Sequence, residues 1–370
     1  MRVALVSSSI FPIPTWRFTG YGSEVITYYL ARWLRGQGHE VFVVAPYSSS
    51  LPPDIPLAPI RASYLSTCLA CEHEAVKFFS HVLAKADVVH DMSALAIVAE
   101  FSYKFGRPTL VTRNGFDLNY PRSHKRNIVV LSRAVQRYAQ YFGIKTRVVP
   151  YGIPINEYPF CGKDDRKDYV FYVGRPHPSK GVDLIIEVAR RMPNTRFILA
   201  WNPTFYDHME YHMEYSLKAK GLRNVVVINL PSNWRGEQVK RQLMCRARLF
   251  LQPTVYLEAF GLTAIEAMAT GTPVLLSTAG SGPEIIRDKA VGLLVRNKLS
   301  LKEQAEEWRD HILDAIDIEE LRQAVEEGLE RRWRYEDVRA YAEERFDISV
   351  MGRKYVELYE ELMRGGFWGD

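Results

Sequence analysis

Short runs rich in valine, isoleucine and leucine alternate with amphipathic stretches of 10 to 16 residues along most of this chain. Strands of a parallel sheet are buried on both faces and appear as continuous apolar runs, and a helix connects each strand to the next. The alternation therefore predicts an α/β fold with helices on both faces of parallel sheets. The expected strands are RVALVSS, EVFVVAP, ADVVH, RPTLVT, NIVVLS and TRVVP, then YVFYVGR, TRFILAW, NVVVINL, ARLFLQP, TPVLLS and GLLV.

The alternation is interrupted once, by the proline-broken and charged segment VVPYGIPINEYPFCGKDDRKD. A chain of 370 residues exceeds the usual size of one hydrophobic core. We therefore expect a linker near residues 150–168 that joins two doubly wound, Rossmann-like domains, 1–155 and 165–345. From about residue 301 the pattern is purely helical and highly charged.

Composition excludes several classes of protein. The chain is 47% hydrophobic and 25% charged, and its apolar runs are shorter than the roughly 18 residues of a membrane span. The start, MRVALVSSSIFPIP, lacks the features of a signal peptide, so we expect a cytoplasmic protein. Residues 1–160 contain 17 basic and 10 acidic side chains, against 31 and 33 in residues 161–370. A solvated surface explains this excess, and an anionic acceptor or membrane headgroups would also suit it. The pattern does not favour nucleic acid.

Cysteines and histidines give weak signals. The CxxC pair Cys68 and Cys71 could be redox-active or half of a metal site, but no second pair completes it, and four cysteines are too few for a disulfide scaffold. His208 and His212 share one helix face, yet HMEYH is not the HExxH of a metalloprotease, so a polar helix face is the better interpretation. The remaining cysteines are Cys161 and Cys245.

The stretch LEAFGLTAIEAMATGTPVL follows the expected strand ARLFLQP and contains two glutamates eight positions apart. We expect a loop with Glu258 and a helix that begins at Phe260 or Gly261. The N–H groups of Phe260, Gly261 and Leu262 at the positive helix end suit a phosphate. If all eight residues were helical, Glu266 would lie roughly 12 Å from Glu258, comparable with the reach from a sugar to a ribose across a diphosphate. A surface helix with two exposed glutamates is the alternative.

A second motif changes the balance between these interpretations. In YVGRPHPSKGVDLIIEVA, Arg175 and Lys180 lie between the first strand and first helix of the second domain. Parallel sheets present ligand-binding groups at the carboxyl ends of their strands. A guanidinium and an ammonium group there can neutralise a diphosphate.

With these residues in view, the sequence resembles the retaining GT-B glycosyltransferases, which include glycogen synthases, sucrose-phosphate synthases and phosphatidylinositol mannosyltransferases. The resemblance rests on GRPHPSKG, EAFGLTAIE with GTPV after it, SGPEII before GLLV, and VVPYGIPINEYPF. It implies that Arg175 and Lys180 contact the donor diphosphate, Glu258 the donor sugar and Glu266 the ribose. It also implies that the final helix, within 347–370, crosses back to the first domain.

The first domain matches less well. TGYGSEV resembles the family's glycine-rich loop, with a tyrosine at the first of two usual glycines, so Gly22 is carried over and Gly20 is its substitute. In ADVVHDMSAL, His90 matches the first of two family histidines, and Met92 stands at the second. Asn114 occupies another position where a histidine is common. These three differences bear on the acceptor side and the sugar contacts.

The resemblance implies front-face transfer of a hexosyl group with retention, from a nucleoside-diphosphate sugar such as a UDP- or GDP-sugar, to a sugar, phosphorylated or lipid-linked hydroxyl acceptor. The chain shows neither a protein nucleophile nor a carboxylate cluster for a divalent metal, so we expect no metal and no cofactor. The base would contact backbone near Asn229 to Pro231. The alternatives are a sugar-nucleotide epimerase on the same scaffold and a donor-binding protein without catalysis.

Overall fold

The protein is described from a computed structural model that covers residues 1–14, 22–62, 68–116, 126–202 and 209–369. The described residues form two compact units. The first contains the described parts of 1–154 together with 347–369, and the second contains the described part of 155–346. Among these residues, no helix combines the length and the apolarity required to cross a bilayer.

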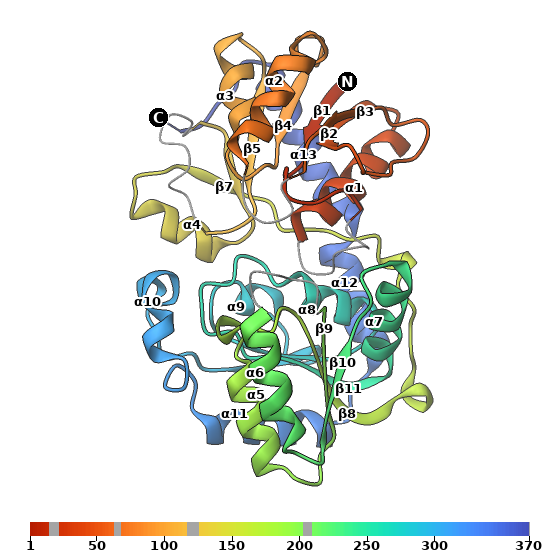
Figure 1. The fold of residues 1–370 in the computed structure, drawn as a ribbon, viewed down its shortest axis with the longest axis vertical. Helices are drawn as coiled ribbons and strands as arrows, with labels where there is room; N and C mark the ends of the chain where they lie inside the picture. Colours follow the sequence, from red (N-terminus) through yellow and green to blue (C-terminus); the bar gives the residue numbers. More distant parts are fainter. Residues whose placement is uncertain (15–21, 63–67, 117–125, 203–208, 370) are drawn as a thin grey trace. The chain divides into compact units, whose positions relative to one another are not determined.

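The first unit is built on a seven-stranded parallel sheet with the order β3-β2-β1-β4-β5-β6-β7. Helices α1 and α13 pack on one face, and α2 and α3 on the other (Figure 1). The strands are β1 (Arg2–Val6), β2 (Glu40–Pro46), β3 (Leu57–Ile60), β4 (Val88–Asp91), β5 (Thr109–Arg113), β6 (Ile128–Val130) and β7 (Thr146–Val148). The helices are α1 (Gly22–Gly36), α2 (Leu69–Leu83), α3 (Ile97–Lys104), α4 (Arg133–Gln140) and α13 (Ile348–Met363).

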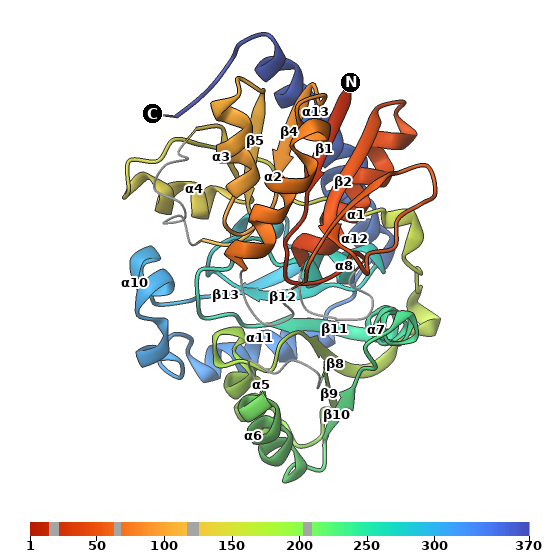
Figure 2. The ribbon, with the colours of Figure 1, turned by 45° about the horizontal axis from the view of Figure 1, so that its top comes forward.

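The second unit contains a six-stranded parallel sheet with the order β10-β9-β8-β11-β12-β13. Helices α5, α6 and α11 form one layer, and α7, α8 and α12 form the other (Figure 2). The strands are β8 (Lys167–Val173), β9 (Phe197–Trp201), β10 (Val225–Asn229), β11 (Ala247–Gln252), β12 (Val274–Ser277) and β13 (Gly292–Val295). The helices are α5 (Val182–Arg191), α6 (Met209–Lys220), α7 (Trp234–Arg246), α8 (Leu262–Ala269), α9 (Gly282–Ile285), α10 (Leu301–Glu306), α11 (Ile318–Glu330) and α12 (Tyr335–Phe346).

The α/β prediction of two doubly wound parallel sheets is confirmed, and every expected strand is present. The strand β3 was missed because LPPDIPLAPI is rich in proline. A proline cannot donate to a sheet ladder and is confined to edge strands. Pro59 lies on β3, the outermost strand of the sheet, and pairs with Ala45 on β2. The strand β3 therefore has a neighbouring strand on one side alone in this sheet.

All four cysteines are paired in disulfides, a pairing that the sequence analysis did not predict. Cys68 and Cys71 bridge the start of α2, and Cys161 is bonded to Cys245 at the end of α7. The second bridge closes a separation of 84 residues within the second unit. The spacing of the CxxC pair was visible in the sequence, whereas nothing local relates the other two cysteines.

Helix α13 completes the first unit through buried polar contacts. His90, at the end of β4, is fully buried, with Nδ1 2.7 Å from the hydroxyl of Tyr359 and Nε2 2.7 Å from that of Thr112. The Thr112 hydroxyl also lies 3.0 Å from that of Tyr355. Burial lowers the pKa of His90 to about 3. The imidazole is therefore neutral, and it joins the sheet to the last helix of the chain.

The packing of α13 against α1 gives a first prediction. A Cβ added at Gly352 would lie 2.3–2.6 Å from ring atoms of Trp33, so Gly352→Ala requires the indole or the helix to shift. We expect the free energy of unfolding to fall by about 1–3 kcal/mol, the usual cost of overpacking. The control is Gly36→Ala at the end of α1, where an added Cβ meets no atom within 4 Å among the described residues. Urea unfolding of both variants measures the difference, and equal midpoints would show that α13 is not packed in this way.

The neutral state of His90 predicts a pH dependence of stability. Because the folded pKa of about 3 lies below the unfolded value of 6.5, the unfolded chain gains a proton that the folded unit excludes as the pH falls below 6.5. The stability supplied by neutral His90 is thus complete above pH 6.5 and declines toward pH 3, by up to about 1.4 kcal/mol per pH unit. His90→Gln should be less stable at pH 8 but show a flatter decline between pH 6.5 and 5. Parallel declines in urea unfolding would rule out a buried neutral imidazole.

Candidate active site

The order in which strands are added to the second sheet reverses between β8 and β11. From β8 the chain adds β9 and β10 on one side, and then returns to place β11, β12 and β13 on the other. Open α/β sheets bind ligands beyond the carboxyl ends of the strands at such a point of reversal. Three loops leave the sheet there, 174–181 after β8, 253–261 after β11 and 278–281 after β12. Arg175 and Lys180 lie in the first loop, Glu258 lies in the second, and the third ends at Ser281, the first residue of the motif SGPEII.

A glycine fixes the loop after β8 against the loop after β11. Gly181 has a φ of +72°, and a Cβ on it would lie 2.1 Å from the carbonyl oxygen of Pro253. Only glycine combines this backbone conformation with such a close approach. The N–H of Val255 also donates to the carbonyl of Ser179 at 2.9 Å. Lys180, the last residue of a short 3₁₀ turn over Pro178–Lys180, is therefore positioned at the end of β11.

Lys180 and Glu258 form a partly buried ion pair across these two loops. The Lys180 Nζ lies 2.5 Å from Glu258 Oε2, and the two side chains are only 12% and 13% exposed. Lys180 also donates to the hydroxyl of Tyr256 at 3.0 Å, and its Nζ lies 4.7 Å from the centre of that ring. The Tyr256 hydroxyl in turn donates to Glu258 Oε1 at 3.3 Å. One tyrosine thus contacts both charges.

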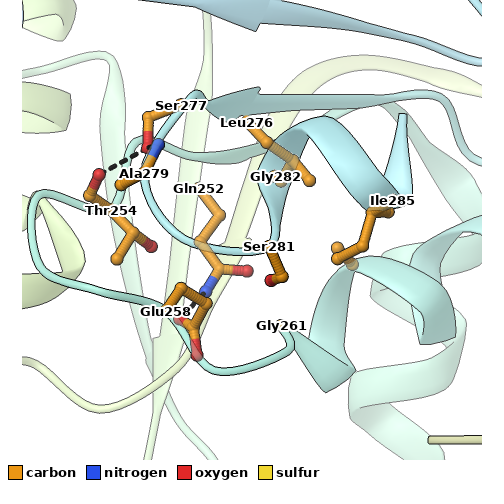
Figure 3. Close-up of a pocket in the computed structure, with 11 residues that line it drawn as sticks. Gln252, Thr254, Glu258, Gly261, Leu276, Ser277, Ala279, Ser281, Gly282 and Ile285 are labelled. Atoms are coloured by element: carbon orange, nitrogen blue, oxygen red, sulfur yellow. Dashed lines mark hydrogen bonds between the residues drawn. The ribbon is translucent and has the colours of Figure 1, made fainter. Parts of the chain in front are cut away.

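Two further contacts orient the Glu258 carboxylate. Gln252, the last residue of β11, lies beside Glu258 (Figure 3) and donates from Nε2 to Glu258 Oε2 at 3.3 Å. The Oε1 of Gln252 accepts from the hydroxyl of Thr263 at 2.9 Å. Behind Glu258, a Cβ on Gly280 would lie 2.2 Å from the Glu258 carbonyl oxygen, which accepts from the Ser281 N–H at 3.0 Å. The recess between these groups has a volume of about 10 Å³, room for about one water. A larger ligand therefore has to lie outside this recess.

The charge of Lys180 is maintained by its surroundings. Burial lowers the pKa of Lys180, but attraction to Glu258 and Tyr256 outweighs burial and raises the pKa above its ordinary value. Repulsion from Arg175, which lies in the same loop, acts in the opposite direction and lowers the pKa of Lys180. The carbonyl of Arg175 accepts from the Tyr172 hydroxyl at 2.8 Å, so its backbone is tied to β8. The structure therefore brings both predicted cations to one edge of the sheet.

Helix α8 begins one or two residues later than the sequence predicted. Gly261 is its N-cap with a φ of +81°, and Leu262 is the first helical residue. Within the described chain, the N–H groups of Gly261 and Leu262 have no acceptor, as expected for the first groups of a helix. The carbonyl of Phe260 accepts from the Ser281 hydroxyl at 2.7 Å, and its ring packs edge-on against Phe346. Among the described residues, the N–H groups of Gly261 and Leu262 therefore remain available at this edge.

Glu266 has different surroundings. Its carboxylate is 5% exposed, lies 3.0 Å from the Nζ of Lys240 and accepts from the Tyr158 hydroxyl at 3.0 Å. Lys240 also pairs with Glu237 at 2.9 Å. Burial lowers the pKa of Lys240, but these two carboxylates outweigh it and raise the pKa above its ordinary range. The assignment of Glu266 to a ribose stays a prediction, and the structure shows that its oxygens already have a cation and a hydroxyl as partners.

The candidates of the first unit are more scattered. Gly20 lies outside the described residues, and Gly22 is the half-buried first residue of α1. Asn114 donates to the carbonyl of Met92 at 2.7 Å and accepts from the Tyr151 hydroxyl at 2.5 Å. His90 is fully buried, and both of its ring nitrogens have partners, so its assignment as a possible site residue stays a prediction.

The remaining candidates concern a base and a metal. Asn229 ends β10, and its Oδ1 lies 3.0 Å from the Nε2 of His212, while His208 lies outside the described residues. In the described chain, one group of metal-ligating types has its ligand atoms within 4.8 Å of one another, Glu303, Glu307 and His311. Glu303 already accepts from the N–H of Ser300 in a capping box of α10, which explains its position without an ion.

Sequence reasoning missed three residues of these clusters. Tyr256 and Gln252 lie within the stretch LQPTVYLEAFG, where an aromatic and an amide beside a predicted carboxylate were a usable signal. Lys240 is 26 positions from Glu266 and belongs to a different helix. No local pattern relates these two residues, so their pairing depends on the packing of α7 beside α8.

Comparison with known proteins identifies the family. The family described as "Glycosyl transferases group 1" matches residues 158–332, and that described as "Glycosyltransferase Family 4" matches residues 21–157. The chain is 32% identical over 134 residues to a D-inositol 3-phosphate glycosyltransferase of Mycobacterium sp. (strain KMS). This match covers 36% of the chain and 30% of the length of that relative.

Solved structures agree on the fold. Sucrose-phosphate synthase from Thermosynechococcus elongatus has a TM-score of 0.72 at 17% identity, covering 99% of this chain and 100% of that one. HepE from Anabaena in complex with UDP-glucose has a TM-score of 0.67 at 19% identity, covering 98% and 100%. With both halves matched by glycosyltransferase families, the resemblance drawn from the motifs is confirmed, and the chain belongs to the glycosyltransferases of the GT-B fold.

Proposed function

We propose that this protein is a retaining hexosyltransferase that moves a sugar from a nucleoside-diphosphate sugar to a hydroxyl acceptor. The observation that carries the proposal is the edge of the second sheet, where Lys180 pairs with Glu258, Arg175 lies in the same loop as Lys180, and α8 begins in the loop that contains Glu258. Cations and unpaired N–H groups suit a diphosphate, and a nearby carboxylate suits sugar hydroxyls. HepE, which has the same fold, was solved with UDP-glucose, so UDP-sugars are the first donors to examine.

The chemistry explains why charge at this edge matters. In front-face transfer the bond from the anomeric carbon to the phosphate oxygen breaks, and its electron pair leaves with the diphosphate. The acceptor oxygen forms its bond on the same face of the sugar, and its proton passes to the departing phosphate. Negative charge therefore grows on the diphosphate in the transition state, where Lys180 and Arg175 would stabilise it most.

The acceptor belongs to the same proposal. The matched relative is a D-inositol 3-phosphate glycosyltransferase, which makes a phosphorylated polyol a first acceptor to test. A plain sugar and a lipid-linked acceptor stay in the same panel. Product formed from donor and acceptor together supports transfer, whereas an isomerised sugar from donor alone would indicate an epimerase. Thermal stabilisation by donor without product from any acceptor would indicate a binding protein.

The role of the two cations predicts the effect of removing them. We expect Lys180→Met and Arg175→Met each to reduce kcat about 100- to 1,000-fold at saturating donor, the usual cost of losing one group that stabilises a developing anion. Lys218→Met is the control, because Lys218 forms exposed ion pairs with Asp183 and Glu214 in the same unit. Near-normal turnover in either cation variant would reject its role at the diphosphate.

Metal removal gives a second prediction. Since protein cations are proposed to neutralise the leaving diphosphate, transfer should proceed at an unchanged rate after dialysis against EDTA. The rate of sugar transfer with and without added Mg²⁺ or Mn²⁺ measures this. Loss of activity in EDTA, restored by either ion, would show that a metal shares the charge of the diphosphate and that the two side chains do not suffice.

A further inference from the structure

The charge of Lys180 is already balanced in this chain. Its Nζ lies 2.5 Å from Glu258, and both side chains are about seven-eighths buried. The Tyr256 hydroxyl contacts both groups, and Gln252 donates to the same oxygen of Glu258 that Lys180 contacts. Glu258, the carboxylate proposed to bind the sugar, is therefore already paired with Lys180, a cation proposed to bind the diphosphate.

This pairing has a consequence for an incoming anion. A phosphate that takes Lys180 as its partner weakens the bond between Lys180 and Glu258. If nothing replaces Lys180, the carboxylate is left partly buried beside a second negative group, with Tyr256 and Gln252 as its remaining donors. Breaking a buried ion pair by removing one partner is strongly unfavourable for that reason. An anion without hydroxyl groups therefore meets opposition at this site.

A sugar nucleotide avoids the opposition. Its phosphates can take Lys180 and Arg175 while its sugar hydroxyls donate to Glu258 and replace the lost ammonium group. Resting on the proposed function, we propose that the Lys180–Glu258 ion pair makes the site selective for an intact sugar nucleotide over the free nucleoside diphosphate. The same competition favours release of the diphosphate after transfer, because the departing sugar leaves Glu258 free to pair with Lys180 again.

Tyr256 and Gln252 are positioning residues in this arrangement. The tyrosine hydroxyl can remain bonded to Glu258 when Lys180 turns to the phosphate, and Gln252 is itself fixed by Thr263 on the first turn of α8. Glu258 can therefore exchange one partner without losing its place. These two contacts keep the Glu258 carboxylate near Lys180, so that it can compete with a phosphate for the ammonium group.

The test uses inorganic pyrophosphate, which has the charge of a diphosphate but neither sugar nor base. We expect Glu258→Gln to bind pyrophosphate about tenfold more tightly than the wild-type chain, because the competing negative charge is gone. The amide oxygen of the new glutamine can still accept from Gln252, so the loop keeps a partner. Isothermal titration calorimetry measures both dissociation constants, and unfolding midpoints check that the variant is folded.

Two controls make the result specific. Glu187→Gln removes one charge from an exposed pair on α5 of the same unit and should leave pyrophosphate binding unchanged. Adding Lys180→Met to Glu258→Gln should abolish the gain, since the gain requires the released ammonium group. If Glu258→Gln does not fold, Glu258→Ser removes the same charge with a smaller side chain, and the same increase is expected.

The outcomes separate the inference from the function on which it rests. Equal or weaker pyrophosphate binding by the folded Glu258 variant, with measurable binding to the wild-type chain, would overturn the selectivity and leave the diphosphate site intact. Absence of binding to every form would overturn the diphosphate site itself. For the sugar nucleotide that stabilises the wild-type protein, the same substitution should weaken binding, so that the two ligands shift in opposite directions. A shift in the same direction would also contradict the selectivity.

Discussion

The ion pair between Lys180 and Glu258 depends on the reversal of the second sheet. These residues are 78 positions apart, and they meet because β8 and β11 are neighbours although β9 and β10 lie between them in the chain. Gly181 then brings the first loop into contact with the carbonyl of Pro253, which no side chain larger than hydrogen would allow. The sheet topology thus makes the two loops neighbours. The close backbone contact between Gly181 and Pro253 then holds the loops near enough for Lys180 to bond to Glu258.

The parts of this arrangement that the sequence could predict are those with a local cause. Apolar runs identified the strands because a strand that is buried on both faces needs apolar side chains along its length. The loop residues after β8 and β11 were assigned to one edge because parallel strands point the same way. The edge strand β3 was missed since its prolines oppose the pattern. The bond of Lys180 to Glu258, in place of a free cation beside a free carboxylate, depends on side-chain distances that no spacing in the sequence specifies.

The two glutamates of EAFGLTAIE illustrate this limit. An all-helical interval would give the two residues a simple separation along one axis, but Gly261 adopts a φ of +81° and only Leu262 onward is helical. Glu258 therefore lies on a loop at the ligand edge, where it can exchange partners, whereas Glu266 lies on the buried side of α8 against Lys240 and Tyr158. The two glutamates thus differ in how readily each carboxylate can exchange its present partners for a ligand.

The same reasoning applies to the first unit, where the family resemblance was weakest. Asn114 donates to the carbonyl of Met92, Met92 accepts through its sulfur from the hydroxyl of Thr27 at 3.5 Å, and the Tyr151 hydroxyl donates to Asn114. These contacts connect the segments that follow β4, β5 and β7 with α1 through neutral groups. Asn114 bonds to the backbone carbonyl at position 92, so this contact does not require a methionine there, whereas the Met92 sulfur itself accepts from Thr27. A histidine at position 92 would therefore replace the group that Thr27 contacts, and a histidine at position 114 would replace the amide that contacts the Met92 carbonyl and the Tyr151 hydroxyl. Each of the two departures from the family pattern thus has its own partner within the first unit.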